Sequence, residues 1–222
     1  KNDNNKMSHS KIRIGISLRI VESTNYIEKR DALSHDWPPL IEKLNALPIF
    51  IPNTLTKLDE FLEDVQIDGL ILSGGDNIGK NPERDLCEKK IIDFGIEHKI
   101  PIFGVCRGMQ AINDYFNGGI ETLTNSKHVE KPHSIKIINS NFSSLLKTSS
   151  IEVNSYHNNI IKQDILGNEL EPFAISLEDK TIEGFFHRKL PIVGVMWHPE
   201  RDPNHNNKII LSKVFHEKNF WN

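Results

Sequence analysis

Short apolar runs alternate with helical patterns through the first half of the chain. Continuous apolar runs of strand length alternate with segments whose apolar residues recur near every 3.6 positions, as in an amphipathic helix. The expected strands are residues 11–18, 48–52, 68–72 and 100–105. The expected helices are residues 39–47, 58–65, 82–99 and 108–119. Strands that alternate with helices of this length predict a parallel sheet with helices on both faces.

The second half of the chain has a different pattern. Short β-rich segments, separated by turn residues, predict an antiparallel extension of the sheet and its final core strands. These segments are residues 134–140, 150–156, 171–179 and 181–197, and a closing amphipathic helix is expected at residues 207–221. No internal repeat or low-complexity linker interrupts the pattern, so residues 11–222 are expected to form a single α/β domain. Residues 1–10 are polar and Asn-rich, typical of a disordered leader or an expression remnant, and no function is assigned to them.

The composition of the chain argues against nucleic-acid binding, membrane spanning and a disulfide-stabilised fold. The 222 residues carry a net charge of −3, which indicates no strong attraction to nucleic acid or to an anionic membrane. No apolar run approaches the roughly 20 residues that a membrane-spanning helix needs, and the start of the chain does not resemble a signal peptide. Because the only cysteines are Cys87 and Cys106, no disulfide framework is expected, and the cytoplasm is the expected location.

Cys106 lies in the segment PIFGVCRGMQ, between an expected strand and an expected helix. In open parallel sheets, ligands bind beyond the carboxyl ends of the strands. The pentapeptide GVCRG is the thiol counterpart of the G-x-S-x-G nucleophile elbow, in which flanking glycines avoid clashes in a tight, strained turn. The N-terminus of the following helix would favour the thiolate. The pentapeptide alone is equally compatible with a buried structural cysteine, which is the role expected for Cys87 inside the helical segment 82–99.

A thiol nucleophile needs a base, and the base needs an orienting group. Among the ten histidines, His198 follows the apolar run PIVGVMW and therefore lies at another expected strand end. Glu200 follows two positions later, and in an extended chain residues i and i+2 project to the same side. Glu200 can then fix the tautomer of His198, which predicts a relay of Cys106, His198 and Glu200. For the segment HPE alone, the alternative is a surface turn with incidental charge.

An acyl transfer also needs backbone N–H donors for its oxyanion. One donor is expected from Arg107, directly after the cysteine, and the second from the glycine pair Gly74-Gly75 at the end of the strand in LILSGGD. Glycines bring main-chain N–H groups close to a ligand because they have no Cβ atom. The alternative is a simple turn, and the spacing of a phosphate-binding loop is absent. No metal is expected, because the chain has neither a C-x-x-C pair nor an HExxH spacing.

The segments LSGGD, FGVCRGMQ and MWHPE together resemble the class I glutamine amidotransferase family, and within it the γ-glutamyl hydrolase branch. NPERD and VNSYHNNII also resemble that branch, and the resemblance extends over about residues 11–215. It implies a flavodoxin-like fold, with a central, mostly parallel sheet flanked by helices and a small antiparallel β extension. It also implies a small-molecule γ-glutamyl substrate and no metal or organic cofactor.

The resemblance gives each matched residue an expected role. Cys106 would be the nucleophile, His198 the general base and acid, and Glu200 the orienting carboxylate. The amides of Gly75 and Arg107 would form the oxyanion hole. The residues expected to bind the glutamyl part of the substrate are Gly74, Gln110, Ser155, Tyr156 and His157.

Two of these substrate-binding expectations have alternatives in the residues themselves. Gln110 lies one turn after Cys106 on the same helix face, so its amide can reach a neighbouring substrate. A solvated helical glutamine is the alternative. His157 lies in a polar, Asn-rich loop, where a surface histidine without a binding role is the alternative.

The implied reaction is hydrolysis of a γ-glutamyl amide through a glutamyl thioester on Cys106. The loop of residues 19–37 should overhang the site, and its cations and aromatic side chain would suit a leaving group with phosphates and a base. These side chains are Arg19, Lys29, Arg30 and Trp37. The alternative is an exposed loop of mixed charge. The chain also resembles the hydrolases of capsule phosphoramidate pathways, which convert γ-glutamyl-CDP-amidate to glutamate and cytidine diphosphoramidate, and a small γ-glutamyl amine or peptide is the other candidate substrate.

Two further function classes stay open. The chain could be a glutaminase subunit that passes ammonia to a synthetase partner. It could also be a catalytically inactive binding or regulatory module of the same fold. The presence of Cys106, His198 and Glu200 together favours an enzyme over the inactive module.

Overall fold

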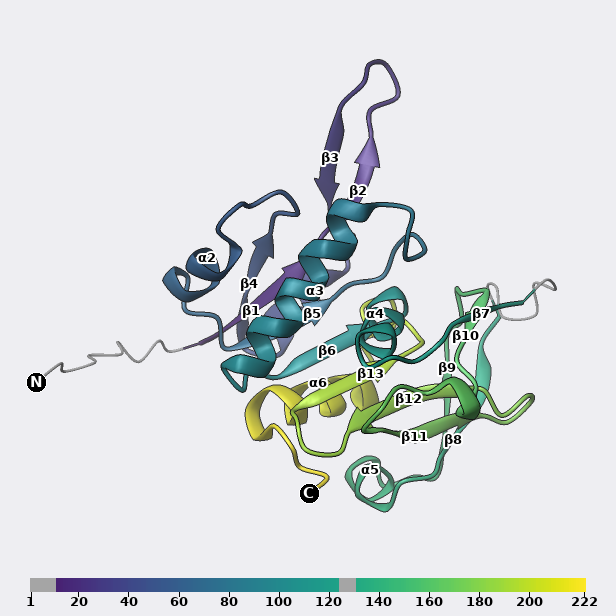
Figure 1. Cartoon of the computed structure of the whole chain (residues 1–222). Coiled ribbons are helices and arrows are strands. Elements are labelled where there is room, and N and C mark those ends of the chain that lie inside the picture. The colour runs from purple at the N-terminus through teal and green to yellow at the C-terminus, as the bar shows by residue number, and fades with distance from the viewer. Residues whose placement is uncertain (1–10, 124–130) are drawn as a thin grey trace, which may run out of the picture.

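A nine-stranded sheet with helices on both faces organises the chain (Figure 1). The structure is a computed structural model that describes residues 11–123 and 131–222, so the expected leader at residues 1–10 lies outside the described residues. The strand order is β4-β1-β5-β6-β13-β12-β11-β8-β9. No helix among the described residues has both the length and the apolar composition needed to cross a bilayer.

The elements follow the alternation expected from the sequence. The strands of the main sheet are β1 (Ile12–Ser17), β4 (Ala46–Ile51), β5 (Gly69–Leu72), β6 (Ile102–Val105), β8 (His133–Ile137), β9 (Ser150–Val153), β11 (Leu170–Ser176), β12 (Ile182–His187) and β13 (Ile192–Val195). The helices are α1 (Trp37–Lys43), α2 (Leu58–Asp64), α3 (Pro82–Glu97), α4 (Arg107–Tyr115), α5 (Ser140–Leu146) and α6 (His205–Glu217), with a 3-10 turn η1 (Gln163–Ile165). Two strand pairs lie outside the main sheet: β2 (Arg19–Glu22) with β3 (Lys29–Ala32), and β7 (Glu121–Thr122) with β10 (Asn159–Ile160).

The main sheet is parallel in one half and antiparallel in the other. Strands β4, β1, β5, β6 and β13 run parallel to one another, and β12, β11, β8 and β9 continue the same sheet in antiparallel register. The predicted α/β class and the antiparallel second half are therefore confirmed. The last strand, β13, pairs with β6 so that Val195 lies opposite Val105. This register brings the residues that follow both strands to the same edge of the sheet.

The core has one apolar layer on each face of the sheet. Side chains of α2, α3 and α4 pack on one face, and side chains of α1, α5 and α6 pack on the other. Representative members are Leu62, Ile91 and Met109 on the first face, and Leu40, Phe142 and Val214 on the second. Because the central strands are buried on both faces, they appear in the sequence as continuous apolar runs rather than alternating ones.

Two expectations about the first 50 residues are wrong in detail. The helix expected at residues 39–47 is α1, which ends at Lys43 because Asn45 takes a left-handed conformation (φ 56°) and the chain turns into β4. The loop expected at residues 19–37 instead contains the hairpin of β2 and β3, which projects from the body of the molecule (Figure 1). Trp37 begins α1 and is 2% exposed in the core, so it is not available to a leaving group.

Candidate active site

Cys106 occupies the sharp turn between β6 and α4. Its backbone has φ 52° and ψ −105°, a conformation that costs a non-glycine residue about 1–3 kcal/mol. The turn is held because the Cys106 N–H donates to the carbonyl of Val195, 2.8 Å away. A Cβ atom on Gly108 would overlap the Leu72 carbonyl, and one on Gly104 would lie 2.7 Å from the Gly108 backbone. Gly108 therefore lets the turn pack directly on β5, and Gly104 lets β6 approach the first turn of α4 closely.

His198 and Glu200 lie together after β13. His198 Nδ1–H donates to Glu200 Oε1 over 2.6 Å, and both residues are 5% exposed. The thiol of Cys106 is close enough to the imidazole of His198 to affect its pKa. Burial lowers the pKa of His198, but the hydrogen bonds and negative charges of Cys106 and Glu200 outweigh this effect and raise the pKa to about 9. The structure thus brings the three side chains together, and the raised pKa favours the protonated imidazole.

Asn154, to which the sequence analysis gave no role, holds the backbone of His198. The His198 N–H donates to Asn154 Oδ1 over 2.8 Å, and Asn154 Nδ2 donates to the His198 carbonyl over 2.9 Å. This pair of hydrogen bonds ties the loop after β9 to the loop after β13. The only sequence signal was its position beside the assigned segment Ser155–His157, because the contact spans 44 residues of sequence.

The glycine pair after β5 lies against the same site. A Cβ atom on Gly74 would be 2.8 Å from His198 Cε1, so the imidazole packs on the glycine backbone. Gly75 has φ 145°, which a residue with a side chain rarely adopts, and a Cβ there would overlap Arg84 Nη1. The Arg107 N–H lies in the first turn of α4, where helix N–H groups have no partner within the helix. Their role as oxyanion donors stays a prediction.

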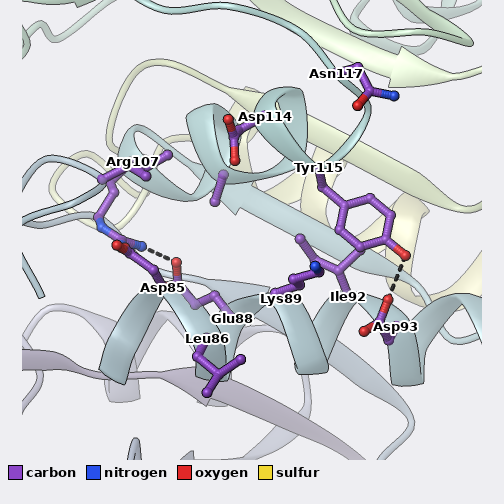
Figure 2. Close-up of a pocket in the computed structure, with 12 residues that line it drawn as sticks. Asp85, Leu86, Glu88, Lys89, Ile92, Asp93, Arg107, Asp114, Tyr115 and Asn117 are labelled. Atoms are coloured by element: carbon purple, nitrogen blue, oxygen red, sulfur yellow. Dashed lines mark hydrogen bonds and ion pairs between the residues drawn. The ribbon is translucent and has the colours of Figure 1, made fainter. Parts of the chain in front are cut away.

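The side chain of Arg107 has a role that the sequence did not reveal. It is 2% exposed and forms ion pairs with Asp85 and Glu88 of α3. Figure 2 shows this contact at the edge of a cleft of about 590 Å³ between α3 and α4. Neither Cys106 nor His198 lines the cleft, so it is separate from the site around the thiol.

Gln110 is buried beside the elbow rather than solvated. Its Oε1 accepts a hydrogen bond from Asn159 Nδ2 over 3.2 Å, and its Nε2 lies 3.7 Å from the sulfur of Met196. Asn159 Nδ2 also donates to Asn77 Oδ1 over 2.9 Å. These contacts fix the orientation of the Gln110 amide near the nucleophile, and a substrate role for Gln110 stays a prediction.

The segment of Ser155, Tyr156 and His157 turns two side chains inward and one outward. Ser155 and His157 are buried, and His157 Nδ1 lies 2.9 Å from the Asn159 carbonyl. Tyr156 is 42% exposed, and its ring lies 5.7 Å from the His198 ring at an angle of 84°. The guanidinium of Arg201 lies 4.1 Å from the centre of the Tyr156 ring. Tyr156 and Arg201 therefore border the site on the His198 side.

The cations of the hairpin are paired with carboxylates. Arg19 lies 3.5 Å from Asp76, and Lys29 lies 2.7 Å from Glu83. Arg30 pairs with Glu28 within the hairpin itself. Of these cations, Arg19 is beside the glycine pair, since a Cβ on Gly75 would be 3.5 Å from the Arg19 Cβ. Within residues 11–123 and 131–222, no group of three or more His, Cys, Asp or Glu side chains could hold a metal ion.

Comparison with known proteins places this fold and site in a family. The Peptidase C26 family model matches residues 13–200. The γ-glutamyl-CDP-amidate hydrolase of Campylobacter jejuni is 36% identical over 209 residues, covering 91% of this chain and 96% of that protein. Protein NtpR of Enterococcus hirae is 31% identical over 196 residues, covering 75% of this chain and 80% of that protein. A crystal structure described as a GMP synthase protein of Thermoplasma acidophilum has a TM-score of 0.71 and 23% identity, over 93% of this chain and 94% of that one.

The family model spans both the elbow and the segment MWHPE, and the Campylobacter jejuni relative aligns over nearly the whole chain. The resemblance expected from the sequence is thereby confirmed. The chain belongs to the Peptidase C26 family and is a hydrolase of the class I glutamine amidotransferase type.

Proposed function

We propose that the chain hydrolyses γ-glutamyl amides through a glutamyl thioester on Cys106. The observation that carries this proposal is the placing of Cys106 and His198 together at the ends of β6 and β13, with His198 Nδ1–H donating to Glu200 Oε1. A strained nucleophile, a base and an orienting carboxylate are the parts that covalent acyl transfer requires. Cys87 offers a contrast, because burial inside α3 raises the pKa of its thiol to about 12 and keeps it unreactive.

The reaction proceeds in two balanced steps. The Cys106 thiolate attacks the δ-carbonyl carbon, and the carbonyl electrons move to the oxygen, which accepts hydrogen bonds from the N–H groups of Gly75 and Arg107. The intermediate collapses, the C–N bond breaks, and His198 gives its proton to the leaving nitrogen. Water then attacks the thioester while His198 takes a proton from it. The C–S bond breaks, which releases glutamate and restores the thiolate.

The proposed substrate is γ-glutamyl-CDP-amidate, which would give glutamate and cytidine diphosphoramidate. The similarity to a γ-glutamyl-CDP-amidate hydrolase over nearly the whole chain supports this choice. The surroundings of His198 support it as well, because the group that protonates the leaving nitrogen is bordered by Tyr156 and Arg201. An exposed aromatic ring suits a pyrimidine base, and a guanidinium suits phosphate oxygens.

The test is a glutamate-release assay on the purified chain with γ-glutamyl-CDP-amidate, a small γ-glutamyl amine and glutamine at equal concentrations. We expect the highest kcat/KM with γ-glutamyl-CDP-amidate, and a loss of at least roughly 10⁴-fold for Cys106→Ala. Cys87→Ala is the matched control and should stay within about threefold of the wild type. Activity in Cys106→Ala would refute the thioester mechanism, and a faster reaction with the small amine would refute the proposed leaving group. Glutamate release only after addition of a synthetase would support a glutaminase subunit instead.

A further inference from the structure

We propose that Arg84 is a positioning residue for the oxyanion hole, and that Glu88 couples it to the second oxyanion donor. Arg84 would hold the peptide between Gly74 and Gly75 in the orientation that presents the Gly75 N–H to substrate. This inference rests on the proposed acyl-transfer reaction and adds two residues, both on α3, that contact neither the thiol nor the imidazole.

The contacts of Arg84 are with the carbonyl side of the glycine pair. Arg84 is 1% exposed, and its Nη2 donates to the carbonyls of Ser73 and Gly74 over 2.8 and 3.0 Å. In a trans peptide the carbonyl and the following N–H point in opposite directions. Because the Gly74 carbonyl points toward Arg84, the Gly75 N–H points away from it.

The peptide between two glycines needs an outside contact to fix its orientation. Glycine reaches conformations with positive φ at little cost, so the peptide of Gly74 and Gly75 can rotate more easily than one between residues with side chains. Rotation by half a turn would replace the N–H with a carbonyl oxygen, which repels an oxyanion instead of stabilising it. The hydrogen bond from the buried guanidinium to the Gly74 carbonyl would be lost in that rotation, and a charged donor makes this bond stronger than a neutral donor would.

Glu88 links Arg84 to Arg107. One oxygen of its carboxylate accepts from Arg84 Nε over 3.1 Å and from Ser17 Oγ over 2.8 Å. The other oxygen pairs with Arg107 Nη1. Arg107 supplies the other expected oxyanion N–H from its backbone, and its guanidinium also contacts Asp85 (Figure 2). A single buried carboxylate therefore fixes the side chains that control both donors.

Stability does not explain why these charged side chains lie here, which leaves the geometry that they impose. Two arginines and the carboxylate of Glu88 are buried between α3, α4 and the end of β5, where desolvation of charges is costly, and Asp85 pairs with Arg107 at the partly exposed edge. An apolar contact between these helices would serve stability at least as well. What the charged network adds is a fixed spacing between the turn after β5 and the first turn of α4.

The experiment uses Arg84→Lys, which keeps a positive charge beside Glu88 but lacks the planar group that donates in two directions. We expect kcat for glutamate release to fall about 10²-fold, the effect of losing one oxyanion donor, with KM within about threefold. Alkylation of Cys106 by iodoacetamide forms no oxyanion, so its rate should match the wild type. Lys89→Arg, on the same helix but outside the network, is the control and should leave both rates unchanged.

Two outcomes would overturn the inference. One is Arg84→Lys with the kcat of the wild type. The other is an equal fall in kcat and in alkylation rate, which would indicate a general disturbance of the elbow.

Glu88→Gln is the second variant if Arg84→Lys does not fold. It should lower kcat about tenfold and leave the rate of Cys106 alkylation unchanged. A crystal structure of the folded variant gives a readout independent of activity: a rotated Gly74–Gly75 peptide is expected, and an unrotated one refutes the inference. Absence of glutamate release in the wild type would refute the proposed function alone.

Discussion

The elbow around Cys106 and the aromatic cluster beneath α5 are both buried, but they are built from opposite kinds of side chain. Around the elbow, the buried groups include charged and strained ones, among them Arg84, Glu88 and His198. The aromatic cluster consists of Phe142, Phe173, Phe186 and Trp221, and the rings of Phe142 and Phe173 stack 3.9 Å apart at 7°. The elbow contains the proposed catalytic groups, whose burial and strain lower stability. The aromatic cluster buries apolar rings, which raises stability.

The difference predicts that reaction rate and stability can be changed separately. Buried charges lower stability unless they are paired, and a strained backbone costs about 1–3 kcal/mol. A buried apolar side chain contributes about 1.5–3 kcal/mol, and cavity formation adds to the loss when it is removed. Substitutions in the elbow should therefore change the rate more than the stability, and substitutions in the aromatic cluster should do the reverse.

The largest effect is expected at the elbow itself, from Cys106→Gly. Glutamate release should fall by at least roughly 10⁴-fold, because the proposed nucleophile is gone. The free energy of unfolding, measured by urea denaturation, should equal or exceed that of the wild type, because glycine adopts the φ of 52° without strain. Cys87→Gly is the matched control: it places glycine inside α3, so stability should fall by about 1 kcal/mol or more while the rate is kept. A clear loss of stability in Cys106→Gly would contradict the comparison.

Phe142→Ala is the corresponding change in the aromatic cluster. Removal of a fully buried ring should lower the free energy of unfolding by about 3–5 kcal/mol. The kcat of the remaining folded protein should stay within about threefold of the wild type, because the ring contacts none of the proposed catalytic residues. Urea denaturation and an assay at a temperature where the variant is folded measure the two quantities. A large fall in kcat for fully folded Phe142→Ala would show that the two regions are not independent.

The two regions also differ in how far the sequence predicted them. The elbow is a local feature: its glycines and its place after an apolar run were sufficient to predict that Cys106 lies in a strand-to-helix turn, and its catalytic role stays a prediction. The position of His198 and Glu200 beside this turn was predicted in the same way, since parallel strands bring their ends to one edge. The alternation of strands and helices was equally local, and it predicted the order of elements through the first half.

The network behind the elbow could not be predicted, because it depends on contacts between distant segments. Arg84, Asp85 and Glu88 have the residue types of a solvated helix face, yet Arg84 and Glu88 are each 1% exposed, because α4 packs over them. Asn154 reaches His198 across 44 residues of sequence. Trp37 was placed in a loop because the segment before it has no strong periodicity. Only the packing of α1 on the sheet shows that Trp37 belongs to the core.

The smallest effect we predict is on the pH dependence of kcat/KM. It again distinguishes the elbow from the aromatic cluster. The pKa of His198 is raised from its ordinary value of 6.5 to about 9, since the hydrogen bonds and charges of Cys106 and Glu200 outweigh desolvation. Because the leaving nitrogen takes its proton from His198 in the proposed mechanism, kcat/KM should fall above pH 9, by about tenfold per pH unit. The stability that this proton contributes is fully present below pH 6.5 and is lost as the pH rises through about 9.

Glu200→Gln tests the cause of the raised pKa. Without the carboxylate, the pKa of His198 should fall toward its ordinary value, and the alkaline decline in kcat/KM should begin below pH 9. Phe142→Ala is the control from the aromatic cluster, and its decline should begin at the same pH as in the wild type. Rate profiles between pH 6 and 10 for the three proteins measure this shift. An unchanged profile in Glu200→Gln would mean that the group titrating near pH 9 is not His198, and the assignment of the leaving-group acid would have to change.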